Sequence, residues 1–194
     1  MSFENILCYG TLNPDLIYFV NELPSKGDDI RSSKSTMRPG GTAINCSELI
    51  SLWSKSVQVR GNSIGSDPMG NYLIDYMKEN NIKFDGLIID QSVTPTCSIF
   101  VDSSGERTIV SSGYEGLEWS NFENLNNFDS LIIDRYSIKF IKDKLKDLKK
   151  LNNLFVCQAG YEYEIDYKLD FLIVSKDEIT VNEANNLIDS ETVE

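Results

Sequence analysis

The stretch NILCYGTLNPD, residues 5–15, begins as an apolar run and ends in polar turn residues. A strand that is apolar at successive positions is covered on both faces, as in a parallel sheet flanked by helices. Similar short runs recur at 56–61 (SVQVRG), 86–90 (GLIID), 130–134 (SLIID), 153–160 (NLFVCQAG) and 170–175 (DFLIVS). Segments with helical periodicity lie between several of these runs. This alternation predicts an α/β fold with a mostly parallel sheet.

Three helices are expected between the strands. The first follows Gly41, and we expect it to cover the sheet with Ile44, Leu49, Leu52 and Trp53. The second begins at residue 68, where proline needs no N–H partner, with Asp67 as its N-cap. The third lies within 137–151 (SIKFIKDKLKDLKKL) and buries four residues: Ile138, Ile141, Leu145 and Leu148. Its lysines are expected to form a solvated face.

Two stretches break the α/β rhythm, residues 16–39 and 95–113. Both have the pattern of strand pairs with turn-rich tips, and VDSSGERTIV (101–110) alternates around a Ser-Gly turn as a hairpin does. We expect them to form a small β sheet outside the main one, as two excursions of a single domain spanning 1–194. The polar segment 186–194 (NLIDSETVE) is expected to fray.

The composition excludes several classes of partner. The chain has 194 residues, 41% of them hydrophobic, which is enough to bury a core and favours a globular, soluble protein. Its 18 basic and 30 acidic residues give a formal charge of −12, which repels nucleic acid and anionic lipid. No basic leader and no run of about 18 apolar residues is present, so we expect a cytoplasmic protein that does not enter membranes.

The four cysteines do not form a recognisable motif. They lie far apart, mostly inside apolar runs, and the chain has no C-x-x-C and no histidine: Cys8, Cys46, Cys97 and Cys157. A zinc site or a Cys-His dyad is therefore not indicated. We expect reduced, buried thiols, as in cytoplasmic proteins.

A glycine pair precedes the first helix in RPGGTAINCSELISLW (38–53). Because Gly40 and Gly41 lack Cβ, a ligand can approach the backbone there, close to the N–H groups at the start of the helix. Asn45, one turn into the helix, can direct its amide at the same place. The alternative is a tight strand-to-helix connection without a ligand. Neither G-x-G-x-x-G nor a P-loop pattern is present.

Asn13 and Asp15 follow the first strand, at its carboxyl end. Open parallel sheets bind ligands at this end of their strands. A carboxylate at this place can accept hydrogen bonds from two sugar hydroxyls at once. The alternative is an Asx turn leading into the first excursion.

Five ordered blocks carry a family resemblance. They are GTLNPD (10–15), RPGGTAINCS (38–47), GNSIGSDPMG (61–70), TPTCSIFVDSSGERTIV (94–110) and LIVSKDE (172–178). In order and spacing they resemble the ribokinase, or PfkB, family of carbohydrate kinases. The chain looks most like the ketohexokinase branch, in which VSKD and GxRTIV also occur. The resemblance implies a three-layer αβα sandwich with a β lid, ATP-dependent phosphorylation of a sugar hydroxyl, Mg²⁺, and dimerisation through the lids.

The resemblance also assigns roles to single residues. The sugar contacts of the family match Asp15, Gly41 and Asn45, and their neighbours Asn13 and Gly40 complete the candidate binding set. Thr42 stands where the ketohexokinase branch commonly has asparagine, so fructose is not assigned as the substrate. Arg107 matches a lid arginine that contacts phosphate or substrate. The alternative is a surface arginine on a hairpin.

Ser175 and Glu178 fall on the N-x-x-E motif of the family, whose glutamate helps hold magnesium through water. S-x-x-E after a strand is also the pattern of a capping box, in which two side chains satisfy the first N–H groups of a helix. The two interpretations do not exclude each other.

The G-A-G-D loop that supplies the catalytic aspartate of the family has no counterpart in the sequence. We therefore assign no catalytic residue and no direct metal ligand, and we expect a family fold truncated at its C-terminus. Three accounts fit: a shortened kinase, one chain of a split kinase completed by a second chain, or a sugar-binding or regulatory remnant. A nucleoside kinase, which shares the fold, is a further alternative.

Overall fold

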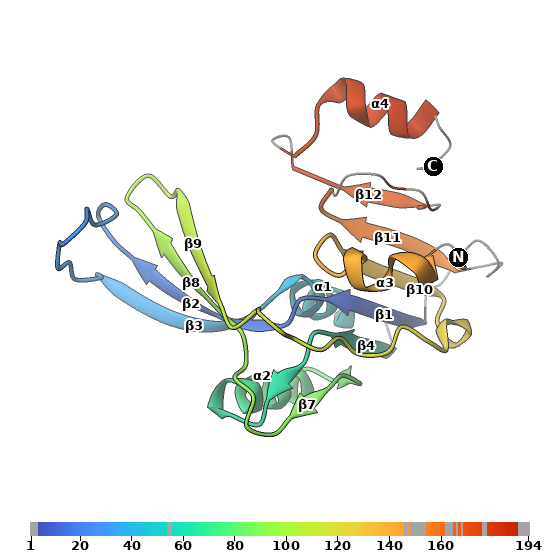
Figure 1. Ribbon diagram of the computed structural model, residues 1–194, viewed down its shortest axis with the longest axis horizontal. Helices are drawn as coiled ribbons and strands as arrows, with labels where there is room; N and C mark the ends of the chain where they lie inside the picture. The colour runs from blue at the N-terminus through green and yellow to red at the C-terminus, as the bar shows by residue number, and fades with distance from the viewer. Residues whose placement is uncertain are drawn as a thin grey trace.

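A six-stranded sheet, parallel throughout, forms the centre of the computed structural model (Figure 1). The structure describes residues 4–53, 56–145, 147, 154–161, 165, 167, 169–175 and 178–189. The strand order is β12-β11-β10-β1-β4-β6. The strands are β1 (Asn5–Gly10), β4 (Ser56–Gly61), β6 (Ile82–Phe84), β10 (Ser130–Asp134), β11 (Phe155–Ala159) and β12 (Phe171–Ile173).

Strand β1 lies inside the sheet because its residues are apolar on both faces. Leu7 and Tyr9 belong to one buried cluster, and Ile6 and Cys8 belong to the other. Each cluster needs a covering layer, since burial of apolar side chains is the main favourable term in folding. The sheet is therefore covered on both sides, as the sequence predicts.

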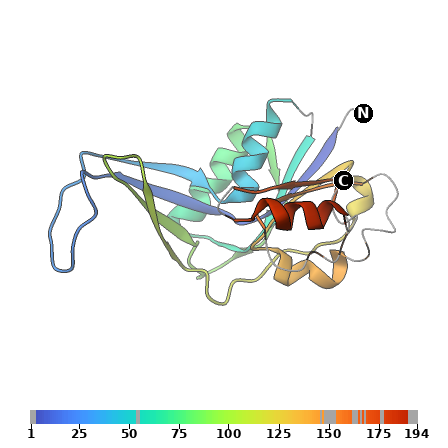
Figure 2. The ribbon, with the colours of Figure 1, turned by 90° about the horizontal axis from the view of Figure 1, so that it is seen from above.

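Helices lie on both faces of this sheet (Figure 2). On one side are α1 (Thr42–Ser51) and α2 (Pro68–Glu79), and on the other are α3 (Ile138–Leu145) and α4 (Val181–Asp189). A short 3₁₀ helix, η1 (Leu125–Asn127), precedes β10. The expected three-layer αβα arrangement is confirmed. Within the described residues, no helix has the length and hydropathy needed to span a membrane.

The two excursions build a second sheet that projects from the first (Figure 1). Its order is β3-β2-β8-β9, and the parallel pairing of β2 with β8 joins the two excursions. The strands are β2 (Asn13–Phe19), β3 (Lys34–Gly40), β8 (Thr96–Val101) and β9 (Arg107–Ser112). The small second sheet expected from the sequence is confirmed, although its first strand begins at residue 13 rather than after 16.

The expected strands at 5–10, 56–61 and 130–134 are found with those bounds. The start of α2 is also as predicted, because the Asp67 carboxylate accepts a hydrogen bond from the Gly70 N–H at 2.8 Å and Pro68 is the first helical residue. In α3, Ile138, Ile141 and Leu145 are buried. The fourth expected core residue, Leu148, lies outside the described residues.

The strand expected at 86–90 is present only at residues 88–89, and its expected place in the main sheet is wrong. The sixth strand of the main sheet is β6, directly after α2, while β7 (Ile88–Ile89) pairs only with β5 (Ile64–Gly65). The chain reverses at Asn81, which has a left-handed φ of 57°, and Ile82 pairs with β4 at once. The sheet edge is therefore already occupied when the chain reaches the more apolar run.

The expected buried face of α1 is also wrong except at Ile44. Leu49, Leu52 and Trp53 are 59%, 74% and 81% exposed, because α1 ends at Ser51 and residue 49 lies on the far side of the helix from residue 44. The buried residues of α1 are Ala43, Ile44 and Ser47. Part of the segment expected to fray, residues 186–189, closes α4, and residues 190–194 lie outside the described part of the chain.

Candidate functional site

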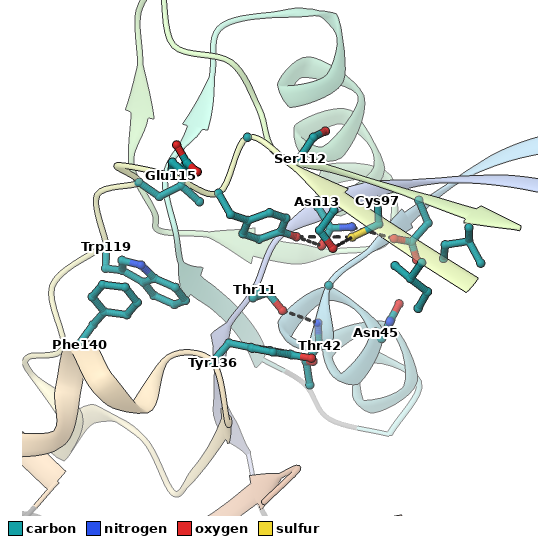
Figure 3. Close-up of a pocket in the computed structure, with 18 of the residues that line it drawn as sticks. Thr11, Asn13, Thr42, Asn45, Cys97, Ser112, Glu115, Trp119, Tyr136 and Phe140 are labelled. Carbon is teal, nitrogen blue, oxygen red and sulfur yellow. Dashed lines mark hydrogen bonds between the residues drawn. The ribbon is translucent and has the colours of Figure 1, made fainter. Parts of the chain in front are cut away.

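A pocket of about 880 Å³ lies where the second sheet leaves the main one (Figure 3). Its walls come from the β1–β2 connection, the start of α1, strands β8 and β9, and the start of α3. This is the carboxyl end of β1 and β10, where the sequence predicts ligand binding. Six predicted site residues line it: Asn13, Asp15, Gly41, Thr42, Asn45 and Arg107. Gly40, Ser175 and Glu178 do not.

The Asp15 carboxylate is the central acceptor of the pocket. Its Oδ1 accepts a hydrogen bond from Asn13 Nδ2 at 2.7 Å, and no donor within the described residues reaches Oδ2. Burial raises the pKa of Asp15 above its ordinary value, although the Asn13 hydrogen bond partly offsets this effect. A half-buried carboxylate with an oxygen that lacks a protein donor can accept hydrogen bonds from ligand groups such as hydroxyls.

Asn13 is buried in the wall rather than free to bind. The residue is 2% exposed, and its Oδ1 accepts a hydrogen bond from the Tyr114 hydroxyl at 2.8 Å. Its Nδ2 donates to Asp15 and, at 3.3 Å, to the Pro14 carbonyl. Both polar ends of this side chain are thus already used within the protein.

Gly40 and Gly41 are required because other parts of the protein pack closely against them. A Cβ at Gly41, where φ is +81°, would lie 2.2 Å from the Thr11 carbonyl oxygen. A Cβ at Gly40 would lie 2.3 Å from the Asp15 carboxylate. Gly41 lines the pocket, whereas Gly40 is buried at the end of β3. The expected ligand access therefore applies to Gly41, and Gly40 makes room for Asp15.

The first amides of α1 are not open to a ligand. The Thr42 N–H donates to Thr11 Oγ1 at 3.1 Å, and the Ala43 N–H donates to the Thr11 carbonyl at 3.2 Å. The expectation that these amides are available as donors is wrong, because Thr11 acts as their cap. Asn45 remains as the exposed amide side chain that faces the pocket from α1 (Figure 3).

Asp134 is a buried carboxylate that the sequence analysis missed. It is 1% exposed and accepts three hydrogen bonds, from the Thr11 N–H at 2.7 Å, the Thr11 hydroxyl at 2.8 Å and the Ser137 N–H at 2.8 Å. It therefore fixes Thr11 and, through Thr11, the start of α1. Its position at the end of the apolar run 130–134 is the signal that could have identified it, since Asp15 was predicted from a similar strand-end position.

The opposite wall of the pocket is aromatic. Trp119 and Phe140 stack with their ring centroids 4.5 Å apart and an angle of 21° between the rings, and Tyr136 lies nearby (Figure 3). The Lys139 ammonium lies 4.8 Å from the Phe140 ring centroid. The pocket thus has polar lining residues at Asp15 and Asn45, and aromatic ones at Trp119, at Tyr136 just before α3 and at Phe140 on α3.

Arg107 is exposed on the edge strand β9 and lines the pocket. Within the described residues its guanidinium has no carboxylate partner. A cation in this position is free to meet an anionic group of a ligand, such as a phosphate. The geometry is compatible with the role that the sequence predicts and does not assign it.

Ser175 and Glu178 lie behind the pocket wall. Glu178 pairs with Arg135, whose guanidinium also donates to the Tyr136 hydroxyl at 2.8 Å. The Ser175 N–H donates to Glu178 Oε2 at 2.9 Å, which is half of a capping box. The complete box belongs to Thr180 and Glu183 at the start of α4.

The described residues do not by themselves form a metal site. No group of three or more acidic, cysteine or histidine side chains among them is arranged to hold an ion. Glu178, the residue that the sequence associates with magnesium, has its two oxygens engaged by Arg135 and the Ser175 N–H. Magnesium bound by proteins usually keeps substrate phosphates and waters among its ligands, so Glu178 could contribute to such a site only together with these other groups.

Comparisons with known proteins identify the fold. A ribokinase from Dictyostelium discoideum is 24% identical over 205 residues, which cover 94% of this chain and 64% of that protein. The ribokinase of Cryptococcus neoformans, solved with ADP, superposes with a TM-score of 0.76 at 20% identity, over 92% of this chain and 58% of the other. The nucleoside kinase of Methanocaldococcus jannaschii gives a TM-score of 0.73 at 23% identity, over 98% and 68%.

These matches show a ribokinase-like fold, and the chain spans slightly less than two thirds of the length of the Dictyostelium relative. The sequence model of the pfkB family of carbohydrate kinases matches residues 4–156, which is most of the chain. The matched part contains β1, the glycine pair, the second sheet and Asp134. The chain therefore belongs to the pfkB family of carbohydrate kinases.

Proposed function

We propose that this chain supplies the sugar-acceptor site of an ATP-dependent carbohydrate kinase of ketohexokinase or ribokinase type. The observation that carries the proposal is the Asp15 carboxylate, which is half-buried in the pocket and whose Oδ2 has no donor among the described residues. A sugar offers adjacent hydroxyl donors, and a carboxylate accepts from two of them at once. Asn45, exposed on the facing helix, supplies an amide for a further hydroxyl.

Arg107 and Glu178 have secondary roles in this proposal. Arg107 meets the phosphate that is transferred, because it is a cation without a carboxylate partner in the described residues. Glu178 is connected to the pocket through Arg135, which also donates to the hydroxyl of the lining residue Tyr136. Its assignment to the magnesium site rests on the family motif alone. Phosphoryl transfer depends mainly on positioning and charge stabilisation, and a G-A-G-D loop is absent from the sequence. The proposal therefore gives this chain the acceptor site and assigns the catalytic base to none of its residues.

The ketohexokinase-like branch is proposed on the motifs GxRTIV and VSKD, and Thr42 is the residue that separates this chain from fructose-specific members. A cytosolic location is proposed because ATP is the proposed donor. Edge strand β9, whose six residues are all exposed, supports a homodimer through the second sheet. Sedimentation velocity tests the dimer: a sedimentation coefficient independent of concentration and equal to that of a monomer contradicts it.

The acceptor site is tested by calorimetric titration of the chain with D-ribose, D-fructose and a non-sugar polyol, together with an ADP-release assay containing ATP and magnesium. We expect one of the sugars to bind at millimolar concentration or below. Binding without ADP release supports an acceptor site whose catalytic loop lies on another polypeptide segment, and binding with release supports a complete kinase. A folded chain that binds neither sugar contradicts the proposal.

A nucleoside kinase is the second candidate, and the aromatic wall of the pocket favours it. Nucleobases stack on aromatic side chains, and Trp119, Tyr136 and Phe140 line the same pocket as Asp15. Adenosine is therefore added to the titration. If adenosine binds more tightly than ribose and loses this binding in Asp15→Asn, the nucleoside assignment replaces the sugar assignment. If ribose or fructose binds and adenosine does not compete, the nucleoside assignment is excluded.

A further inference from the structure

Three side chains form a hydrogen-bonded chain that ends at the candidate acceptor. The Tyr114 hydroxyl donates to Asn13 Oδ1 at 2.8 Å, and Asn13 Nδ2 donates to Asp15 Oδ1 at 2.7 Å. Tyr114 follows β9 in the second sheet, whereas Asn13 and Asp15 lie on β2, about a hundred residues earlier. The last turn before Tyr114 is made by Gly113, which has a φ of +78°.

The donor and acceptor at each of these hydrogen bonds are fixed by the chemistry of the three side chains. The Asn13 amide can donate only through Nδ2 and accept only through Oδ1, and a carboxylate only accepts. Asp15 therefore requires Nδ2 to face it, and Oδ1 then requires a donor on its other side. Tyr114 supplies that donor. The alternative orientation of the amide would place two acceptors, Asn13 Oδ1 and the Asp15 carboxylate, against each other.

The hydroxyl of Tyr114 is a dependable donor. Burial raises the pKa of Tyr114 above its ordinary value, and the neighbouring Cys97 thiol and Asp15 raise it further. The phenol is therefore protonated at neutral pH. Cys97 Sγ lies 3.7 Å from the same hydroxyl, and a thiol is a weak hydrogen-bonding group compared with an amide oxygen.

We propose that Tyr114 is a positioning residue of the acceptor site: its hydroxyl orients the Asn13 amide, and this amide holds the Asp15 carboxylate with Oδ2 turned to the ligand. Asn13, 2% exposed with both polar atoms engaged, acts through Asp15. The second sheet thereby contributes to the sugar site through a hydrogen bond as well as through its lining residues. The positioning of Asp15 by Tyr114 does not depend on the proposed acceptor function, whereas the expected effect on sugar binding rests on it.

The test compares Tyr114→Phe with the wild-type chain in two measurements. The first needs no ligand: the pKa of Asp15 is followed by ¹³C NMR of its side-chain carboxyl. The Asn13 hydrogen bond stabilises the ionised carboxylate, so a loosened amide raises the pKa of Asp15 in the variant. Other ionisable groups near Asp15 are Arg38 and Cys97, opposite it in the sheet, and Arg107 on β9 lines the same pocket. None of these is changed by the substitution.

The second measurement is the affinity for the sugar that the wild-type chain binds. We expect Tyr114→Phe to weaken it by about three- to ten-fold, the usual effect of one lost hydrogen bond. Tyr72→Phe is the matched control, because it also removes a hydroxyl that donates to the protein, to the Met37 carbonyl at 3.4 Å, but lies away from the pocket. We expect that control to leave both the Asp15 pKa and the sugar affinity unchanged.

The outcomes separate the two proposals. An unchanged pKa of Asp15 in a folded Tyr114→Phe chain overturns the positioning role, whatever the sugar affinity. If the pKa of Asp15 is raised in Tyr114→Phe but the wild-type protein binds no sugar, the result supports the hydrogen bonds from Tyr114 through Asn13 to Asp15 and contradicts the acceptor function. A raised pKa with weakened sugar binding supports both. A change of equal size in Tyr72→Phe overturns the assignment, since it would reflect a general loosening of the second sheet.

Discussion

Asp15→Asn is expected to weaken sugar binding by about 10- to 150-fold, which corresponds to about 1.5–3 kcal/mol for hydrogen bonds to a charged group. The amide keeps the shape of the carboxylate but replaces one acceptor oxygen by a donor. The variant is expected to remain folded with undiminished stability. Burial raises the pKa of Asp15, so its ionised form disfavours folding above that pKa, and a neutral side chain removes this cost.

The measurement is a pair of calorimetric titrations, supported by urea denaturation of each variant. Asp29→Asn is the matched control, because it removes the same charge from an exposed position of the β2–β3 loop. Sugar affinity in the wild-type chain should also fall on acidification, as Asp15 takes up a proton. Because burial raises its pKa, this loss begins at a higher pH than for an exposed aspartate. Equal affinities in Asp15→Asn and the wild type would return Asp15 to a purely structural role.

Gly41→Ala is expected to lower the free energy of unfolding by about 3 kcal/mol or more. An L-residue at a φ of +81° costs about 1–2 kcal/mol, and the new Cβ would lie 2.2 Å from the Thr11 carbonyl oxygen. That oxygen is part of the backbone and accepts the Ala43 N–H, so it cannot move without disturbing the start of α1. Urea denaturation, with its midpoint and slope, measures the change.

Gly27→Ala is the control for this prediction. Gly27 also has a positive φ, of +95°, but an added Cβ there meets no atom within 4 Å. It therefore carries the conformational cost without the clash, and we expect a loss of about 1 kcal/mol. Equal losses in the two variants would show that the close approach of Thr11 to Gly41 does not constrain the fold.

The sequence predicts the central strands well because their pattern is local. The run at 5–10 is apolar on both faces, and the cap at Asp67 with proline after it defines the start of α2 without reference to the rest of the chain. The edge of the sheet is not predictable in this way. Ile82–Phe84 is a weaker apolar run than 86–90, yet this segment, directly after α2, is the one that pairs with β4 as β6.

In the site, too, residues within short motifs are predictable from the sequence, whereas contacts between residues far apart in the sequence are not. Asp15, Gly41, Thr42 and Asn45 lie in short motifs, and the structure brings them to one pocket. Tyr114 reaches Asn13 from 101 residues away, and Asp134 reaches Thr11 from 123 residues away. Such contacts depend on how the second sheet and β10 are placed, and no spacing in the sequence encodes them.

The requirement for glycine at positions 40 and 41 has a different physical reason from the one that the sequence suggests. The sequence suggests space for a ligand, whereas the structure shows that Gly40 and Gly41 accommodate Asp15 and the Thr11 carbonyl. The amides at the start of α1, which looked available, are capped by Thr11. The proposed sugar contacts are therefore the Asp15 and Asn45 side chains rather than the backbone of this turn.

The central claim is that a sugar binds against Asp15 at the carboxyl end of β1. Titration of the ¹⁵N-labelled chain with D-ribose or D-fructose, followed by amide chemical shifts, locates the ligand most directly. The account predicts that the largest shifts belong to the Asp15, Gly41 and Thr42 backbone amides and the Asn45 side-chain amide. Saturable shifts confined to residues outside the pocket, or no shifts at millimolar sugar, would contradict it.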